Sequence, residues 1–73
     1  MAKKIVKWSG HAPDRCDLCR VPIQNTFVDG KTNMGPWASM CPDCHDAHGV
    51  GLGTGMGQKY QKQPNGEWIK VEG

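Results

Sequence analysis

Two short stretches decide the fold of this chain: Cys16-Asp17-Leu18-Cys19 and Cys41-Pro42-Asp43-Cys44. The spacing within each stretch lets both thiolates point at one centre. Two such turns that face each other supply four sulfur ligands for a closed tetrahedral metal site, and zinc is the usual occupant. The sequence therefore predicts one structural Zn²⁺ bound by Cys16, Cys19, Cys41 and Cys44.

The chain has 73 residues, which predicts a single domain over 1–73. Within it we expect a metal core over 14–49, a glycine-rich loop over 49–57 and a C-terminal strand over 67–72. So short a chain buries little apolar surface on folding. Zinc bound by four thiolates contributes on the order of 10 kcal/mol, comparable to the net stability of a small domain. We therefore expect folding to depend on the metal.

The cysteines could instead form two disulfides in an exported protein. The first residues, Met1-Ala2-Lys3-Lys4-Ile5-Val6-Lys7-Trp8, contain no apolar run of signal-peptide length. No run of about 18 apolar residues, long enough to span a membrane, occurs in the sequence. We therefore expect a soluble cytoplasmic protein with no membrane partner, in which paired thiols bind metal more often than they oxidise.

Charge and its distribution bear on the partner. The formal net charge of +2 counts the cysteines as neutral, and a divalent ion held by four thiolates adds about −2. The net charge therefore does not indicate nucleic-acid binding. Lysines nevertheless gather towards both ends of the chain, where they could contact phosphates, and two aromatic residues could stack on bases. The candidate contacts to a partner or nucleic acid are Lys3, Lys4, Lys7, Trp37, Lys59, Tyr60 and Lys62.

Strand and helix signals surround the cysteines. Residues 3–8 and 67–72 are typical of short strands, and we expect them to pair, with Trp8 and Trp68 in the core or as cross-strand partners. Asp29-Gly30 is a hairpin signal, and the return strand is expected over 37–40. Pro42 and Gly49 are typical of the start and stop of a short helix from Cys41 to His48.

A cysteine-containing turn (a zinc knuckle) at Cys16–Cys19 is followed by a hairpin and then a helix, and this order resembles the treble-clef family of zinc fingers. The resemblance covers residues 14–49 and depends on Cys16, Cys19, Cys41 and Cys44. It implies a small metal-stabilised α+β fold in which the first turn of the helix supplies the second ligand pair. A zinc ribbon, with both knuckles on hairpins, is the alternative. The chain also resembles short zinc-finger proteins of bacterial and bacteriophage genomes, a likeness that implies no particular function.

The segment Gly49-Val50-Gly51-Leu52-Gly53-Thr54-Gly55-Met56-Gly57 has glycine at every second position. In an extended chain these glycines would share one face and leave bare backbone that something approaches closely. The chain's own sheet, Trp37 packed against that face, or a flexible loop are structural explanations. A phosphate or a partner's backbone is the functional one, with Lys59 and Lys62 nearby.

Other chemistries use the same residue types. The two cysteine pairs resemble rubredoxin, which implies iron-based electron transfer, but Arg20 and His45 stand where rubredoxins usually carry glycine. Cys41-x-x-Cys44-His45 matches the haem-attachment motif, which leaves the first pair unexplained. His45 or His48 could replace a cysteine as a ligand. Four thiolates leave zinc no open position for water. We therefore expect a non-enzymatic binding or regulatory protein that docks on a larger protein or a nucleic acid, with no small-molecule substrate.

Overall fold

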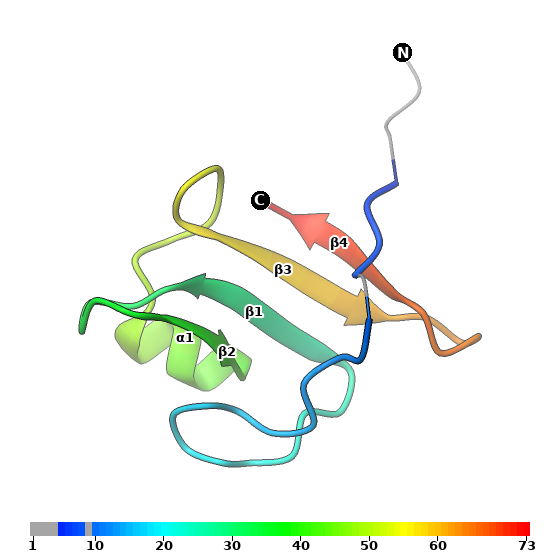
Figure 1. Cartoon of the computed structure of the whole chain (residues 1–73), viewed down its shortest axis with the longest axis horizontal. Coiled ribbons are helices and arrows are strands. Elements are labelled where there is room, and N and C mark those ends of the chain that lie inside the picture. Colours follow the sequence, from blue (N-terminus) through cyan, green and yellow to red (C-terminus); the bar gives the residue numbers. More distant parts are fainter. Residues whose placement is uncertain (1–4, 9) are drawn as a thin grey trace.

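A computed structural model describes residues 5–8 and 10–73. In this part of the chain, four antiparallel strands form one sheet and a single short helix packs beside it (Figure 1). The sheet order is β2-β1-β3-β4. The elements in chain order are β1 (Thr26–Lys31), β2 (Trp37–Met40), α1 (Pro42–His48), β3 (Gly57–Lys62) and β4 (Trp68–Glu72). The chain is therefore a small α+β fold, as the sequence predicts, and no described helix is long and apolar enough to cross a membrane.

The hairpin between the two cysteine pairs is confirmed. β1 pairs with β2 from Val28↔Met40 to Lys31↔Trp37, and the return strand covers the predicted residues 37–40. The prediction that Asp29-Gly30 marks the turn is wrong, because both residues lie inside β1. A Cβ at Gly30 would lie 2.9 Å from the Met56 carbonyl oxygen, so the glycine permits a close approach between backbones and does not form a turn.

The turn of the hairpin is organised by Thr32, whose side chain is buried. Its hydroxyl donates to the carbonyl of Pro36 at 2.9 Å and accepts from the amide of Met34 at 3.3 Å. Such a local side-chain hydrogen bond stabilises a loop in place of a backbone ladder. The loop between the two strands begins at Thr32, after Lys31 has completed β1.

The short helix α1 is also confirmed. Pro42 occupies its first turn, where its missing N–H costs nothing, and Asp43 lies near the positive end of the helix dipole. The helix ends at His48, and Gly49 donates its N–H to the carbonyl of His45. This helix positions the second cysteine pair at the edge of the sheet.

β3 lies inside the sheet, between β1 and β4, and the sequence did not predict it. Its residues pair with β1 from Thr26↔Gln61 to Gly30↔Gly57. The composition of the strand is polar apart from Tyr60, which is buried against Phe27. A strand is predicted from sequence when several apolar residues alternate with polar ones, so that they share one face. A single tyrosine does not make such a pattern.

The N-terminal strand predicted over 3–8 is not formed in residues 5–8, the part of it that the structure describes, but this segment does contact β4. Lys7 bridges Ile69, the amide of Trp8 donates to Trp68, and the amide of Lys70 donates to Val6. The observed β4 covers 68–72, within the predicted range 67–72. Lys3, Lys4 and Ser9 lie outside the described residues.

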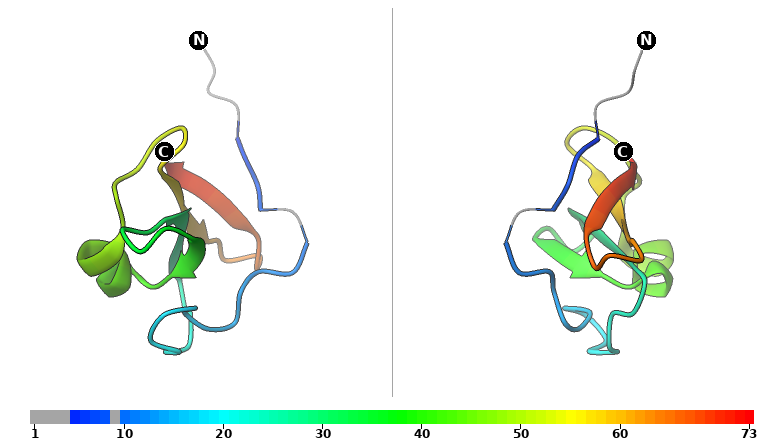
Figure 2. Two further views of the ribbon diagram at one scale, coloured as in Figure 1. Left: turned by 60° about the vertical axis from the view of Figure 1, so that its left-hand side comes forward. Right: turned by 90° about the vertical axis from the view of Figure 1, so that its right-hand side faces the viewer.

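The two faces of the sheet carry separate clusters. On one face the rings of Trp8, Phe27, Tyr60 and Trp68 pack with centroid separations between 5.0 and 5.3 Å. Trp8 and Trp68 are partly buried in this cluster, where the ring of each packs against Phe27. The backbone hydrogen bond between them makes them cross-strand neighbours, one of the two predicted alternatives. On the other face Met40 and Ala38 pack with the cysteines and Leu18. α1 and the N-terminal segment lie on opposite sides of the sheet (Figure 2).

Candidate metal centre

The first cysteine pair is held by a tight turn that precedes β1. The amide of Cys16 donates to Val21, the amide of Arg20 donates back to Cys16 at 3.0 Å, and Arg15 bridges Pro22. The amide of Leu18 points at the sulfur of Cys16 with an N–H···S distance of 3.4 Å. Amides that point at sulfur favour its ionised form, which is the form that binds metals.

The second pair is held by the start of α1. Cys41 is the N-cap residue, and its sulfur accepts a hydrogen bond from the amide of Cys44 at 3.4 Å. A cysteine sulfur thus replaces the usual side-chain oxygen at a helix N-terminus. One helical turn brings Cys44 to the same side as Cys41, as the predicted helix requires.

A pair of hydrogen bonds joins the first turn to β2. The amide of Asp17 donates to the carbonyl of Ser39 at 2.8 Å, and the amide of Ser39 donates to the Asp17 carboxylate at 2.9 Å. Because β2 leads through Met40 directly into Cys41, this contact fixes the separation of the two cysteine pairs. The sequence gives no sign of this contact, since no local pattern connects residues so far apart.

The four sulfur atoms lie within 4.8 Å of one another, and those of Cys19 and Cys41 are 3.7 Å apart. A zinc–sulfur bond of about 2.3 Å implies a separation of about 3.8 Å between sulfurs at the corners of a regular tetrahedron. All four cysteines are free thiols. The cluster therefore has the ligand type, number and spacing to hold a metal ion.

The environment divides the thiols into two kinds. Burial by itself would raise the pKa of Cys16, but backbone amides of Cys19, Cys41 and Leu18 overcome this effect and lower that pKa to about 6. Burial raises the pKa of Cys41 and, more strongly, that of Cys44, where the neighbouring sulfurs add to the shift. One ligand is thus ionised readily near neutral pH, while these two release their protons when a cation binds.

The histidines near the second pair take other roles. His45 Nε2 lies 3.1 Å from the carbonyl oxygen of Gly51 and so connects α1 to the glycine-rich loop. Within the described residues, the cluster that could hold a metal consists of the four cysteines alone. Neither His45 nor His48 belongs to it, although the sequence left both as alternative ligands.

The glycine-rich segment forms a loop and is not an extended strand. Gly51, Gly53 and Gly55 all have positive φ, so the segment winds into a loop. A Cβ at Gly53 would lie 3.2 Å from the terminal methyl of Met56, and one at Gly51 would lie 3.5 Å from its sulfur. The group that approaches these glycines closely is therefore the chain's own Met56, a structural role that requires no phosphate.

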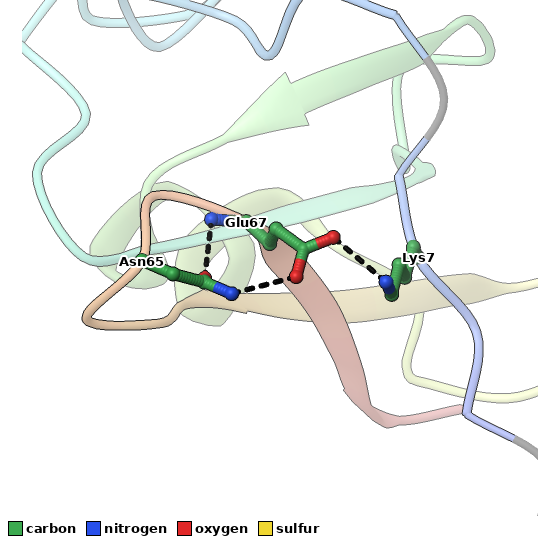
Figure 3. Close-up of polar contacts among 3 residues, drawn as sticks. All are labelled: Lys7, Asn65 and Glu67. Carbon is green, nitrogen blue, oxygen red and sulfur yellow. Dashed lines mark hydrogen bonds and ion pairs between the residues drawn. The ribbon is translucent and has the colours of Figure 1, made fainter.

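The candidate contact residues do not form one surface. Lys3 and Lys4 lie outside the described residues. Lys7 is paired with Glu67 at 2.7 Å (Figure 3), and Lys59 lies 4.0 Å from Glu72. Tyr60 is only 8% exposed, within the aromatic cluster. Trp37 is 49% exposed at the start of β2, whereas Lys62 is exposed at the far end of β3, where it pairs with Trp68.

Comparisons of the chain with models of protein families, with curated proteins and with solved structures found no match. The assignment of the cysteine cluster as a metal centre therefore depends on its own geometry.

Proposed function

We propose that this chain is a small non-enzymatic zinc protein, in which one structural Zn²⁺ bound by Cys16, Cys19, Cys41 and Cys44 stabilises a binding or regulatory module. The observation that carries the proposal is the convergence of the four sulfur atoms to within 4.8 Å. Four thiolates satisfy the tetrahedral preference of zinc and leave no position for a reactive water. The metal would accordingly contribute stability and no chemistry.

The order of elements supports a treble-clef-like arrangement over a zinc ribbon. A knuckle with Cys16 and Cys19 precedes the β1–β2 hairpin, and the second pair lies at the start of α1 and not in a second hairpin. The cysteine pairs also resemble those of rubredoxin, but Arg20 and His45 stand where rubredoxins usually carry glycine. At its position after the second cysteine, His45 belongs to the helix, where a glycine would be unfavourable.

The partner is proposed to be a larger protein or a nucleic acid in the cytoplasm. The lysines of the described residues are dispersed over the sheet and partly engaged by carboxylates. Phosphate-driven binding would show a steep loss of affinity with salt. Affinity for an oligonucleotide that survives high salt would therefore contradict a phosphate-driven mode.

The metal is tested first by native mass spectrometry of the intact chain, purified without chelator and without added metal. We expect one zinc per chain with four reduced thiols. Bound iron would contradict the structural zinc site and favour electron transfer. A metal-free chain with two disulfides would overturn the proposal.

The ligand set is tested by comparing Cys44→Ser with His48→Gln. Loss of a thiolate removes a ligand together with the folding free energy that depends on the metal, so Cys44→Ser should lose zinc and unfold. His48 lies outside the sulfur cluster, so His48→Gln should keep one zinc and its fold. Retention of zinc by Cys44→Ser would contradict the four-cysteine site.

A further inference from the structure

A cavity of about 440 Å³ lies between segments that are distant in sequence, and its lining includes none of the cysteines. Its wall includes His11 and Asp14 from the N-terminal turn, Ile23 and Gln24 from the segment before β1, and Lys62 and Trp68 from β3 and β4. The volume falls within the range of about 300–1,000 Å³ that is typical of small-ligand sites. We call this space the Trp68 cavity.

Backbone hydrogen bonds hold the walls of the Trp68 cavity in place. The amide of Ile23 donates to Asp14 at 2.9 Å, and the amide of Lys62 donates to Asn25 at 2.8 Å. The indole N–H of Trp8 donates to the carbonyl of His11 at 3.2 Å. The first of these contacts joins the N-terminal turn to the segment before β1, and the second joins that segment to β3. The walls of the cavity are therefore held in place by the fold itself.

Its chemistry combines an aromatic surface with a free cation. Lys62 and Trp68 are cross-strand partners, so their side chains lie on the same face of the sheet. The ring of Trp68 is supported by Phe27, with centroids 5.0 Å apart, and remains partly exposed. An aromatic ring beside a cation is the arrangement with which proteins bind a base and its phosphate.

The nearby carboxylates contact groups other than Lys62. Asp14 lies in the cavity wall, 3.3 Å from the ring of His11, which also lines the cavity. Glu67 is held by Lys7 at 2.7 Å and by the side-chain amide of Asn65 at 2.7 Å (Figure 3). Within the part of the chain that the structure describes, Lys62 forms no ion pair. Its charge is therefore free to meet an anionic group.

We propose that the Trp68 cavity binds a nucleotide, with the base against Trp68 and the phosphate at Lys62. Gln24 and the backbone of the N-terminal turn would face the edge of the base. A free mononucleotide and the phosphorylated end of a single strand share this chemistry. The inference rests on the proposed role of the chain as a binding module, and it is independent of which metal the cysteines hold.

The test is a calorimetric and tryptophan-fluorescence titration of the metal-loaded full chain. The probes are UMP, uridine, and a uridine hexanucleotide with and without a 5′-phosphate. We expect UMP to bind at least about fivefold more tightly than uridine, because only UMP meets Lys62 through a charge-assisted hydrogen bond. Tighter binding of the phosphorylated hexanucleotide than of UMP would identify a strand end as the source. Equal binding would identify the mononucleotide.

Lys62→Gln and Lys59→Gln form a matched pair of variants. Lys62 is exposed, so its substitution should leave the fold intact. Lys62→Gln should weaken UMP binding about fivefold or more and lower the salt dependence of hexanucleotide binding by about one unit of slope. Lys59→Gln removes the same charge from the opposite face of β3 and should change neither value.

Three results would overturn the inference. Equal affinity for UMP and uridine would show that the phosphate does not meet Lys62, and an unchanged affinity of Lys62→Gln would show the same. Absence of binding to every nucleotide probe by a folded, zinc-loaded chain would exclude a nucleotide site. That last result would leave the metal centre standing, whereas a chain without zinc would contradict the proposed function itself.

Discussion

Arg20, the residue after the first cysteine pair, has φ of +67°, and within the described residues it is the only residue other than glycine with a positive φ. A side chain in this left-handed conformation costs roughly 1–2 kcal/mol, and glycine avoids that cost while losing about 0.5–1 kcal/mol in chain entropy. Arg20→Gly should therefore stabilise the zinc-loaded protein by about 0.5–1 kcal/mol, measured by urea unfolding. The backbone contacts of Arg20, including the hydrogen bond from Arg15 to its carbonyl, remain available.

A substitution that increases the backbone strain provides the control for Arg20→Gly. A β-branched residue tolerates positive φ least, so Arg20→Val should destabilise the protein relative to wild type. If Arg20→Gly were less stable than wild type, the aliphatic part of Arg20 would contribute packing that outweighs the backbone strain.

Asp29 lies on the aromatic face of β1, and both burial and the charge of Asp17 raise its pKa. Because its pKa is higher in the folded state than in the unfolded chain, the ionised carboxylate lowers stability at neutral pH. This loss disappears as the pH falls below the unfolded value of about 3.9. Asp29→Asn should thus stabilise the protein at pH 7, and the gain should shrink towards pH 4.

The measurement is urea unfolding in excess zinc, at pH 7 and at lower pH values down to the point where wild type begins to release zinc. Asp46→Asn is the control, because it removes the same charge from an exposed position on α1. A gain for Asp29→Asn that does not change as the pH is lowered over this range would contradict a titrating carboxylate as its cause.

Among the secondary-structure elements, the connection from α1 into the glycine-rich loop depends on close packing at Gly49. A Cβ there would overlap the His45 ring and lie 2.7 Å from the His45 carbonyl oxygen, although φ is an ordinary −74°. Gly49→Ala should therefore cost about 1–3 kcal/mol as an overpacked site. It should also break the hydrogen bond between His45 and Gly51.

Gly55→Ala is the matched control for this prediction. Gly55 has φ of +80° and open space where the methyl group of alanine would lie, so this substitution should cost only about 1 kcal/mol of backbone strain. The imidazole NMR shifts of His45 should change in Gly49→Ala and stay unchanged in Gly55→Ala. Equal shifts in both variants would contradict a local contact at Gly49.

How far the sequence predicted each element depended on how local its signal was. The return strand 37–40 and the helix beginning at Pro42 were predicted because their signals are local. Prolines, glycines and the spacing of the cysteines indicate the start or end of an element within a few residues. β3 was missed because its place in the sheet comes from pairing with β1, which only the tertiary fold supplies. The alternating glycines left open an extended chain or a loop, and the structure shows a loop in which positive φ at Gly51 and Gly53 turns the segment around Met56.

In the candidate site too, features with a local sequence signal were predicted, and features made by the tertiary fold were not. The four cysteines were found because their chemistry is carried by spacing alone. The hydrogen bonds between Asp17 and Ser39 could not be predicted from the sequence, since β1 and the hairpin turn lie between these residues in the chain. The Trp68 cavity was also missed, because Lys62 and Trp68 become neighbours only through the register of β3 and β4.

In the complete fold, the cysteine cluster and the aromatic cluster share β1. Phe27 contributes to the aromatic face, while the adjacent Val28 faces the other side and pairs with Met40 of the cysteine cluster. Successive residues of a strand point to opposite faces, so β1 contributes side chains to both clusters. Disruption of β1 would therefore disturb both. The sheet therefore couples the two clusters.

Removal of zinc by a chelator at neutral pH should consequently unfold the whole chain. The linked free energy, on the order of 10 kcal/mol, is comparable to the total stability of a small domain. Near-UV circular dichroism, which reports the packing of Trp8, Phe27, Tyr60 and Trp68, should be lost at the same free zinc concentration as the far-UV signal of the sheet. Added zinc should restore both signals together. An aromatic signal that persisted after the metal had left would show that the sheet and its aromatic face form a stable unit without the cysteine cluster.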